Sequence, residues 1–141
     1  MEFVILVGRI MYAAVFIGSA IGGHFMNMNS TAQYAEARGN TNAPMKVSLA
    51  GLWILAAGIM IVFGIWTDIG FLMAMLWCLV SAVFVHHFWT DEGMIQQIEM
   101  SMFMKNLSIA GAGLILFILF AWARGAIGLQ LVGPYFEITS L

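Results

Sequence analysis

Polar and titratable side chains gather in one short stretch of an otherwise apolar chain. Two of the three histidines, three of the seven acidic residues and one of the five basic residues lie between Phe84 and Asn106. Histidine and carboxylate side chains can bind metals, exchange protons or hydrogen-bond an oxygenated ligand. Burying such groups singly costs several kcal/mol each, so they concentrate for a reason. The stretch indicates either an interface between lipid and water or a functional site.

A metal site is the first chemistry to weigh. The side chains that supply suitable nitrogen and oxygen ligands for zinc, iron or copper are His24, His86, His87 and Glu99. If His86 and His87 are neighbours on a helix, their side chains point about 100° apart and cannot share one inward site. The sequence also lacks a compact ligand spacing such as HExxH. We therefore predict no metal site, and expect interfacial histidines that are hydrogen-bonded to their neighbours.

A haem site would need histidines from facing helices, which His24 and His86 could supply. Both histidines, however, fall near the end of an apolar run and not at its middle. Phe88 and Trp89 also crowd the position beside His86. The sequence therefore disfavours haem.

A quinone is the remaining cofactor candidate. Its headgroup needs a polar donor at the interface, an apolar channel for the tail and a titratable group for protons. The residues that could supply the donors and a proton path are His87, Trp89, Glu99 and Lys105. The alternative is purely structural: Glu99 pairs with Lys105, or Asp91 with Lys46, and the pair neutralises charge at a helix entrance. We expect the ion pairs, and keep the quinone site as the alternative.

The elements that must position these groups follow from composition. Apolar residues make up 62% of the 141 residues and charged residues 9%, whereas soluble domains carry about 25% charged residues. Runs of about 20 apolar residues are long enough to cross a bilayer, where the backbone must be helical. The four runs are Phe3–Met26, Met45–Trp66, Ile69–Trp89 and Phe103–Trp122. We predict an all-α fold, a four-transmembrane-helix antiparallel bundle embedded in lipid.

Shorter elements fall between the runs. Thr31–Arg38 is expected to form a short interfacial helix in the first loop, capped by Ser30 or Thr31 and ended by Gly39. Met94–Met102 also has helical character and is expected to lie along the interface. Four spans place both termini on one side of the membrane. The polar residues expected to gather on the opposite side are His24, Lys46, His86, His87, Trp89, Asp91, Glu99, Lys105 and Asn106.

The side that carries the termini has its own charged residues. Arg9 lies about two turns into the first run, where a charge must snorkel or find a partner. Asp68, in the turn between the second and third runs, is the expected partner of a partly buried Arg9. Small residues predict close helix contacts elsewhere. The positions expected to make them are Ala14, Gly18 and Gly22 in the first run, and Gly51 and Gly58 in the second.

Charge and cysteine content exclude several classes of protein. The net charge of −2 argues against binding to nucleic acid and against a polybasic lipid anchor. Cys78 is the single cysteine, so an internal disulfide, a CxxC pair and a thiolate zinc site are excluded.

Several of these features together resemble the DoxX family of membrane proteins. The residues that carry the resemblance are Arg9, Gly22-Gly23-His24, His87-Phe88-Trp89, Asp91, Gln97, Glu99, Phe103, Lys105-Asn106-Leu107 and Ala110-Gly111-Ala112-Gly113. The resemblance covers about Gly8 to Trp122 and implies a four-helix membrane domain over residues 1–124. Residues 125–141 then form a C-terminal tail that looks like an addition to the family pattern.

The resemblance also implies a class of function. Some DoxX proteins are linked to quinone-dependent thiosulfate oxidation, and others to membrane assemblies that handle thiol and oxidative stress. We expect a non-catalytic subunit that docks or stabilises a respiratory or photosynthetic redox complex, because the chain is small and carries no redox motif. The alternative is a quinone-linked oxidoreductase subunit with its site at the His-Phe-Trp end. A small transporter is a weaker alternative, since no broken helix or inverted repeat is visible.

Orientation rests on the resemblance. The basic residues divide two against three between the sides, with Arg9 and Arg124 on one and Arg38, Lys46 and Lys105 on the other. This count is nearly even and does not set the topology. The resemblance implies a bacterial inner-membrane protein with cytoplasmic termini, so the His-Phe-Trp end is expected to face outward.

Overall fold

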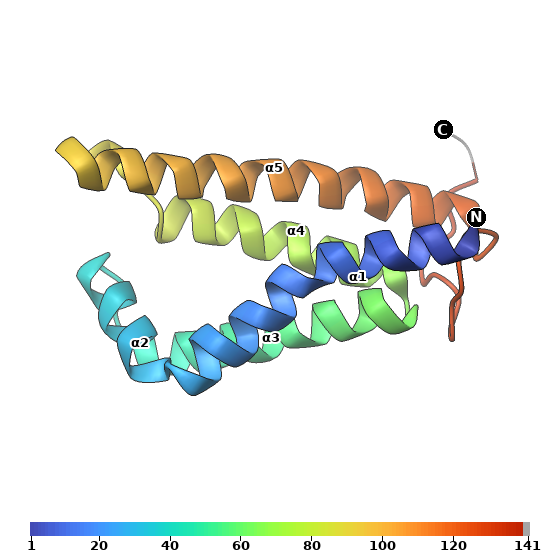
Figure 1. Ribbon diagram of the computed structural model, residues 1–141, viewed down its shortest axis with the longest axis horizontal. Helices are drawn as coiled ribbons and strands as arrows, with labels where there is room; N and C mark the ends of the chain where they lie inside the picture. Colours follow the sequence, from blue (N-terminus) through green and yellow to red (C-terminus); the bar gives the residue numbers. More distant parts are fainter. Residues whose placement is uncertain (140–141) are drawn as a thin grey trace.

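The computed structural model describes residues 1–139 and is built from four long apolar helices and one short helix (Figure 1). Each long helix is long and apolar enough to cross a membrane, which confirms the predicted fold class. The first span is an α-helix that continues without a break into a π-helix. The elements are α1 (Glu2–Gly18), the π-helix η1 (Ser19–Met26), α2 (Met28–Ala37), α3 (Ala43–Phe63), α4 (Thr67–Phe84), the 3₁₀ turn η2 (Phe88–Thr90) and α5 (Gly93–Ala123).

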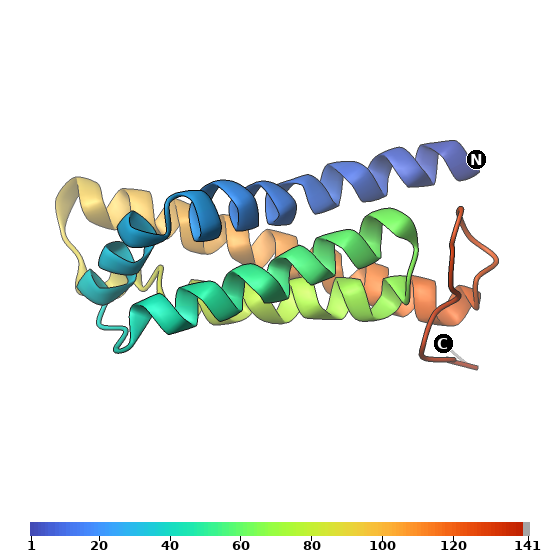
Figure 2. The same cartoon turned by 90° about the horizontal axis from the view of Figure 1, so that it is seen from below.

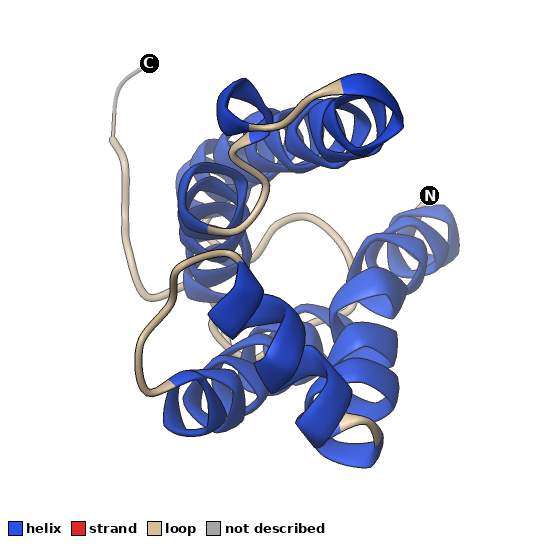
Figure 3. Ribbon diagram, turned by 90° about the vertical axis from the view of Figure 1, so that its left-hand side faces the viewer, coloured by secondary structure: helices blue, strands red, loops and turns tan. Residues whose placement is uncertain are grey.

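The helices form a curved row in which α1 packs on α3, α3 on α4, and α4 on α5. The end view in Figure 3 shows α1 and α5 at the two ends of this row. Tyr12 bridges them, because its hydroxyl donates to the Ile109 carbonyl at 3.1 Å. The N-terminus and the end of α5 lie at the same end of the bundle, as predicted from the four spans, and α2 lies at the other end (Figures 1 and 2).

Glycines in α3 allow the first span to approach closely. A Cβ on Gly58 would lie 2.6 Å from Cγ1 of Ile17, and a Cβ on Gly51 would lie 2.7 Å from Cβ of His24. Close contacts at these two glycines are therefore confirmed.

The predicted contacts of the first-span ridge are wrong within this chain. Gly18 and Gly22 have no neighbour within 4 Å of an added Cβ, and Ala14 is exposed. The buried face of the first span instead carries Ala13, Phe16 and Ala20. The ridge of Ala14, Gly18 and Gly22 faces away from the rest of the bundle.

Two helix boundaries on the polar side differ from the prediction. α4 ends at Phe84 and not at Trp89, so His86 and His87 lie in a turn and not on a helix. α5 begins at Gly93 and continues for 31 residues, so Met94–Met102 is helical as predicted, but it is the start of the fourth span and not a separate interfacial helix. Neither Gly nor Pro interrupts the chain from 94 to 103, and nothing breaks the helix there. At 1.5 Å per residue α5 is about 46 Å long, and its first turns extend beyond a hydrocarbon core of about 30 Å.

The short helix α2 begins earlier than predicted, at Met28, and Asn27 precedes it. Gly39 follows its end with a φ of 81°, a left-handed conformation that glycine adopts without strain. The presence of the helix and the role of Gly39 are confirmed, whereas the predicted cap at Ser30 or Thr31 is wrong.

Arg9 and Asp68 do not pair with each other, which corrects the predicted ion pair. Arg9 is 2% exposed, so it does not snorkel, and it donates to the carbonyls of Ile61 at 2.6 Å and Val62 at 2.7 Å. Carbonyls in the last turn of a helix lack partners within the helix, which makes them acceptors for a buried guanidinium. Arg9 also donates to the carbonyl of Leu129 in the tail.

Asp68 fastens the same tail from the other side. Its carboxylate is fully buried and accepts the backbone N–H groups of Tyr135 and Phe136 at 2.8 to 3.1 Å. The tail thereby folds across the end of the bundle that carries the N-terminus, as Figure 2 shows. Ser140 and Leu141, the last two residues of the predicted tail, lie outside the described residues.

Candidate functional site

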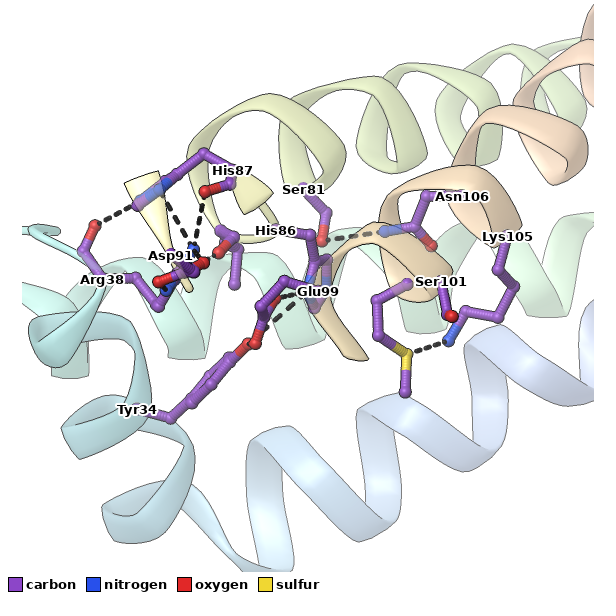
Figure 4. Close-up of polar contacts among 12 residues, drawn as sticks. Tyr34, Arg38, Ser81, His86, His87, Asp91, Glu99, Ser101, Lys105 and Asn106 are labelled. Atoms are coloured by element: carbon purple, nitrogen blue, oxygen red, sulfur yellow. Dashed lines mark hydrogen bonds and ion pairs between the residues drawn. The ribbon is translucent and has the colours of Figure 1, made fainter. Parts of the chain in front are cut away.

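The polar end of the bundle is organised by α2, which packs on α3 and η1. Tyr34 lies in the last turn of α2, and Arg38, four residues later, is the residue that caps the C-terminal end of the helix. Figure 4 shows both side chains reaching from α2 toward the turn after α4 and the start of α5. Each side chain builds one of two polar groups that lie next to each other.

The first group is a clamp formed by Arg38. Its guanidinium donates to the two carboxylate oxygens of Asp91 at 2.8 and 2.9 Å, and its Nε donates to the carbonyl of Val85 at 2.8 Å. Nη2 also lies 3.0 Å from Nδ1 of His87. A guanidinium only donates, so Nδ1 of His87 accepts, while its Nε2 donates to the Arg38 carbonyl at 3.1 Å. The clamp therefore holds His87 as the neutral Nε2–H tautomer.

Within the clamp, the Arg38 guanidinium and the Asp91 carboxylate each stabilise the charged form of the other. The hydrogen bonds from Arg38 hold the pKa of the Asp91 carboxyl below its usual range, against a smaller opposing effect of burial. The same hydrogen bonds raise the pKa of Arg38. Two-pronged pairing of this kind fixes orientation as well as charge, so α2 is fastened to the turn that carries the histidines.

The second group joins Tyr34, Glu99 and His86. The Tyr34 hydroxyl donates to Oε1 of Glu99 at 2.6 Å, and Nδ1 of His86 lies 2.8 Å from Oε2 (Figure 4). A carboxylate accepts, so Nδ1 of His86 carries the proton. Glu99 is 5% exposed, and both of its oxygens are satisfied. Burial, followed by the hydrogen bond to Glu99, raises the pKa of Tyr34 well above its ordinary value. This group is a chain of acid–base side chains linked by short hydrogen bonds.

The ion pairs expected from the sequence are wrong. Glu99 pairs with His86 and not with Lys105, and Asp91 pairs with Arg38 and not with Lys46. Lys105 is exposed, and its Nζ lies 3.2 Å from Sδ of Met102. Long lysine side chains at a membrane surface can remain hydrated, whereas the planar guanidinium matches a carboxylate better.

The remaining predicted residues form no hydrogen bond with the two groups, although the Trp89 ring packs on the ring of His87 with centres 5.9 Å apart. Asn106 is buried on α5 and donates to Oγ of Ser81 at 3.3 Å. Trp89 is exposed and packs edge-on against Phe103, with ring centres 6.0 Å apart. Lys46 is exposed at the start of α3. The structure thus brings together His86, His87, Asp91 and Glu99, and it adds Tyr34 and Arg38 to them.

Tyr34 and Arg38 are the residues that sequence reasoning missed. Neither is among the residues that the sequence predicts to gather at this end, and the charge of Arg38 enters only the count of basic residues. One signal could have found them, because they are four apart on a polar helix on the same side as the histidines. A Tyr/Arg face on that helix is the nearest source of hydrogen-bond donors for carboxylates in the later loop.

A cavity of about 540 Å³ lies beneath the polar groups. It is bounded by α1 and η1 on one side and α5 on the other, with α2, α3 and α4 completing the wall. Its apolar wall includes Phe16, Ile54 and Trp77, while Tyr34 and His86 line its polar end. The cavity lies on the η1 side of the Tyr12 bridge, where α1 and α5 have no extensive contact. Ligand sites in proteins commonly have this size and this mixture of walls.

His24 also lines the cavity and is 7% exposed. Its Nδ1 lies 3.0 Å from the carbonyl oxygen of Ser19 in its own π-helix, and its ring packs edge-on against Trp77. π-Helical turns often occur at functional sites. Within residues 1–139 no three histidine, cysteine, aspartate or glutamate side chains gather closely enough to hold a metal ion.

Comparison with known proteins identifies relatives of this chain. The DoxX family model matches residues 4–87. The chain is also similar to the inner membrane protein YphA of Escherichia coli (strain K12), with 33% identity over 114 residues that cover 79% of each chain. No solved structure matches the chain.

Proposed function

The chain belongs to the DoxX family of integral membrane proteins, and from this premise we propose that it binds an isoprenoid quinone as a subunit of a membrane redox assembly. The observation that carries the proposal is the cavity, because its apolar walls end at the hydrogen-bonded group of Tyr34, Glu99 and His86. A quinone needs this combination of an apolar site and a proton-exchanging end. A site built from polar groups alone would not hold the ring.

The walls of the cavity suit a ring that carries an apolar tail. Trp77 and Phe16 offer flat apolar surface to a ring, and offset or edge-on aromatic contacts stabilise such a ring. The side between α1 and α5 lacks extensive helix contact, which provides a route from the bilayer for the tail. Both features favour a ligand that enters from lipid over one that enters from water.

The polar end supplies the proton chemistry. His86 lines the cavity and donates from Nδ1 to Glu99, so its Nε2 can accept a proton while the carboxylate stabilises the resulting imidazolium. Tyr34 completes the hydrogen bonds of Glu99 and holds the carboxylate in place. These three side chains can move one proton between the cavity and the membrane surface without a change of fold.

Electrons must come from or go to another subunit. Quinone chemistry exchanges two electrons, and Cys78 is the single cysteine of the chain, so no internal dithiol couple is available. The outward ridge of Ala14, Gly18 and Gly22 allows the close approach of another transmembrane helix. We place the termini in the cytoplasm, which reporter fusions at each end of the chain would test.

The test is to purify the protein from its native membranes in mild detergent and measure bound quinone by chromatography of the lipid extract. We expect quinone close to one per chain in the parent, and its loss in Ala50→Phe, which fills the cavity wall. Ala56→Phe is the matched control, since Ala56 lies on the same helix as Ala50 but is exposed and outside the cavity lining. Absence of quinone from the parent, or equal quinone in both variants, contradicts the proposal.

A further inference from the structure

The ring of His24 has a defined hydrogen-bonding direction. Its Nδ1 lies 3.0 Å from the carbonyl oxygen of Ser19, and a carbonyl can only accept, so Nδ1 carries the proton. A neutral imidazole that donates from Nδ1 has a lone pair on Nε2. Because Nδ1 is bonded to the backbone of η1 and His24 lines the cavity, Nε2 is the ring nitrogen that remains free to meet a ligand there. The structure gives Nε2 no hydrogen-bond partner in the part of the chain that it describes.

The crowding around His24 keeps this orientation. An added Cβ on Gly51 would lie 2.7 Å from Cβ of His24, and the ring rests edge-on against Trp77 with centres 5.8 Å apart. The residue as a whole is 7% exposed. A ring held in this way keeps the lone pair of Nε2 available to water or to a ligand in the cavity.

Two further polar residues that line the cavity, His86 and Tyr34, also use their hydrogens inside the protein. His86 donates from Nδ1 to Glu99, and the Tyr34 hydroxyl donates to the same carboxylate (Figure 4). Both residues therefore offer lone pairs, and not hydrogens, to the cavity. Lys46 and Lys105 also belong to the lining, but both are exposed and lie at its rim.

We propose that the cavity selects the reduced, hydroxyl-bearing form of its ring ligand, and that Nε2 of His24 accepts the hydroxyl hydrogen. The inference rests on the proposed function and deepens it, because it assigns the redox form that the site holds. A hydroquinone donates two hydroxyl hydrogens, whereas a quinone only accepts. A quinone carbonyl opposite Nε2 leaves two acceptors facing each other, which weakens binding by about tenfold or more.

Preferential binding of the reduced form has a redox consequence. If the hydroquinone binds about tenfold more tightly, the reduction potential of the bound couple rises by about 30 mV relative to the free couple. The site then binds hydroquinone from the bilayer, and the partner subunit must carry out a reaction that oxidises it. The protein would deliver the reduced ligand and would not generate it.

The test compares three short-tailed ligands with the full-length protein in lipid nanodiscs. They are a benzohydroquinone, the matching quinone and the dimethyl ether of the hydroquinone, which keeps the ring but cannot donate. Dissociation constants are measured by equilibrium dialysis without oxygen. We expect the hydroquinone to bind about tenfold more tightly than the other two. In His24→Phe the three constants should converge, while His24→Gln, which retains an acceptor oxygen, should keep part of the preference.

Each result decides one proposal. Equal binding of the three ligands to the parent overturns this inference and leaves the proposed function intact. An unchanged preference in His24→Phe assigns the selection to another residue and also overturns it. If no ligand binds, the proposed function fails and the inference fails with it. The ligand series in the parent is decisive even if His24→Phe does not fold.

Discussion

Arg38 and Asp91 are 53 residues apart in the sequence, yet the guanidinium of one contacts both carboxylate oxygens of the other at 2.8 and 2.9 Å. This contact fastens α2 to the turn between α4 and α5. It thereby sets the roof of the cavity, since Tyr34 lines the cavity one helical turn before Arg38.

Separation of this pair should destabilise the polar end. We expect Arg38→Gln and Asp91→Asn each to lower the melting temperature of the protein in nanodiscs by a few degrees. The double variant should lose less than the sum of the two, because each single change strands a charge on the partner. Glu92→Gln is the matched control, since Glu92 is the exposed neighbour of Asp91. Strict additivity of the two losses would show that the pair is not coupled.

The clamp should also give a defined pH dependence. The pKa of Asp91 is lowered in the folded protein by its hydrogen bonds from Arg38, so its contribution to stability is fully present above the unfolded pKa of about 3.9. That contribution is lost as the pH falls through the lower, folded pKa. The difference in melting temperature between the parent and Asp91→Asn should be constant near neutral pH and shrink below about pH 4. A difference that stays constant down to about pH 2 contradicts this assignment.

The Tyr34–Glu99 hydrogen bond is a separate contribution. Tyr34→Phe should lower the free energy of unfolding by about 1.5 kcal/mol. This value is at the low end of the range for a hydrogen bond to a charged acceptor, because Tyr34 is 40% exposed. Glu99→Gln should cost at least as much, since it weakens the bonds from both Tyr34 and His86. Lys105→Met should leave the stability unchanged. A loss in Lys105→Met as large as that in Glu99→Gln would restore the pairing expected from the sequence.

Substitution by alanine should change the free energy of unfolding differently at Gly51, which contacts the first span, and at Gly18, which faces outward. Gly51→Ala should lower the free energy of unfolding by about 1–3 kcal/mol, because its Cβ would lie 2.7 Å from Cβ of His24. Gly18→Ala has open space around it and should be neutral or stabilising by up to about 1 kcal/mol. Thermal unfolding of the two variants in the same lipid provides the comparison. Equal losses would mean that the outward ridge packs within the chain after all.

Asp68 should control the order of the C-terminal tail. Asp68→Ala removes the acceptor of the Tyr135 and Phe136 N–H groups, and we expect faster hydrogen exchange and proteolysis at residues 129–138. Glu137→Ala is the control, because the Glu137–Arg124 pair is long, at 4.0 Å, and exposed. Unchanged exchange in Asp68→Ala would show that Arg9 and the backbone contacts hold the tail alone.

The class of the protein follows from its sequence alone. Runs of about 20 apolar residues can only be helices in lipid, since lipid offers no partner for backbone N–H and C=O groups. Four such runs place both termini at one end, so the histidines, Asp91 and Glu99 had to meet at the other. The resemblance to the DoxX family agrees with the comparisons, in which the family model matches residues 4–87 and ends before Phe88-Trp89 and Lys105-Asn106-Leu107.

Only the tertiary structure decided which face of each helix is buried and which polar residues pair. In a membrane both the lipid-facing and the protein-facing sides of a helix are apolar, so no polar stripe marks the outside. The sequence therefore could not show that Ala13 and Ala20 are buried while Ala14 and Gly18 face outward.

The partners of Asp91 and Glu99 were undetermined for a related reason. They come from a short helix more than 50 residues away, and charge alone made Lys46 and Lys105 equally eligible partners. The packing of α2 on α3 and η1 placed Arg38 and Tyr34 within hydrogen-bonding distance and left the lysines at the surface. Distance, and not charge, selected the pairs.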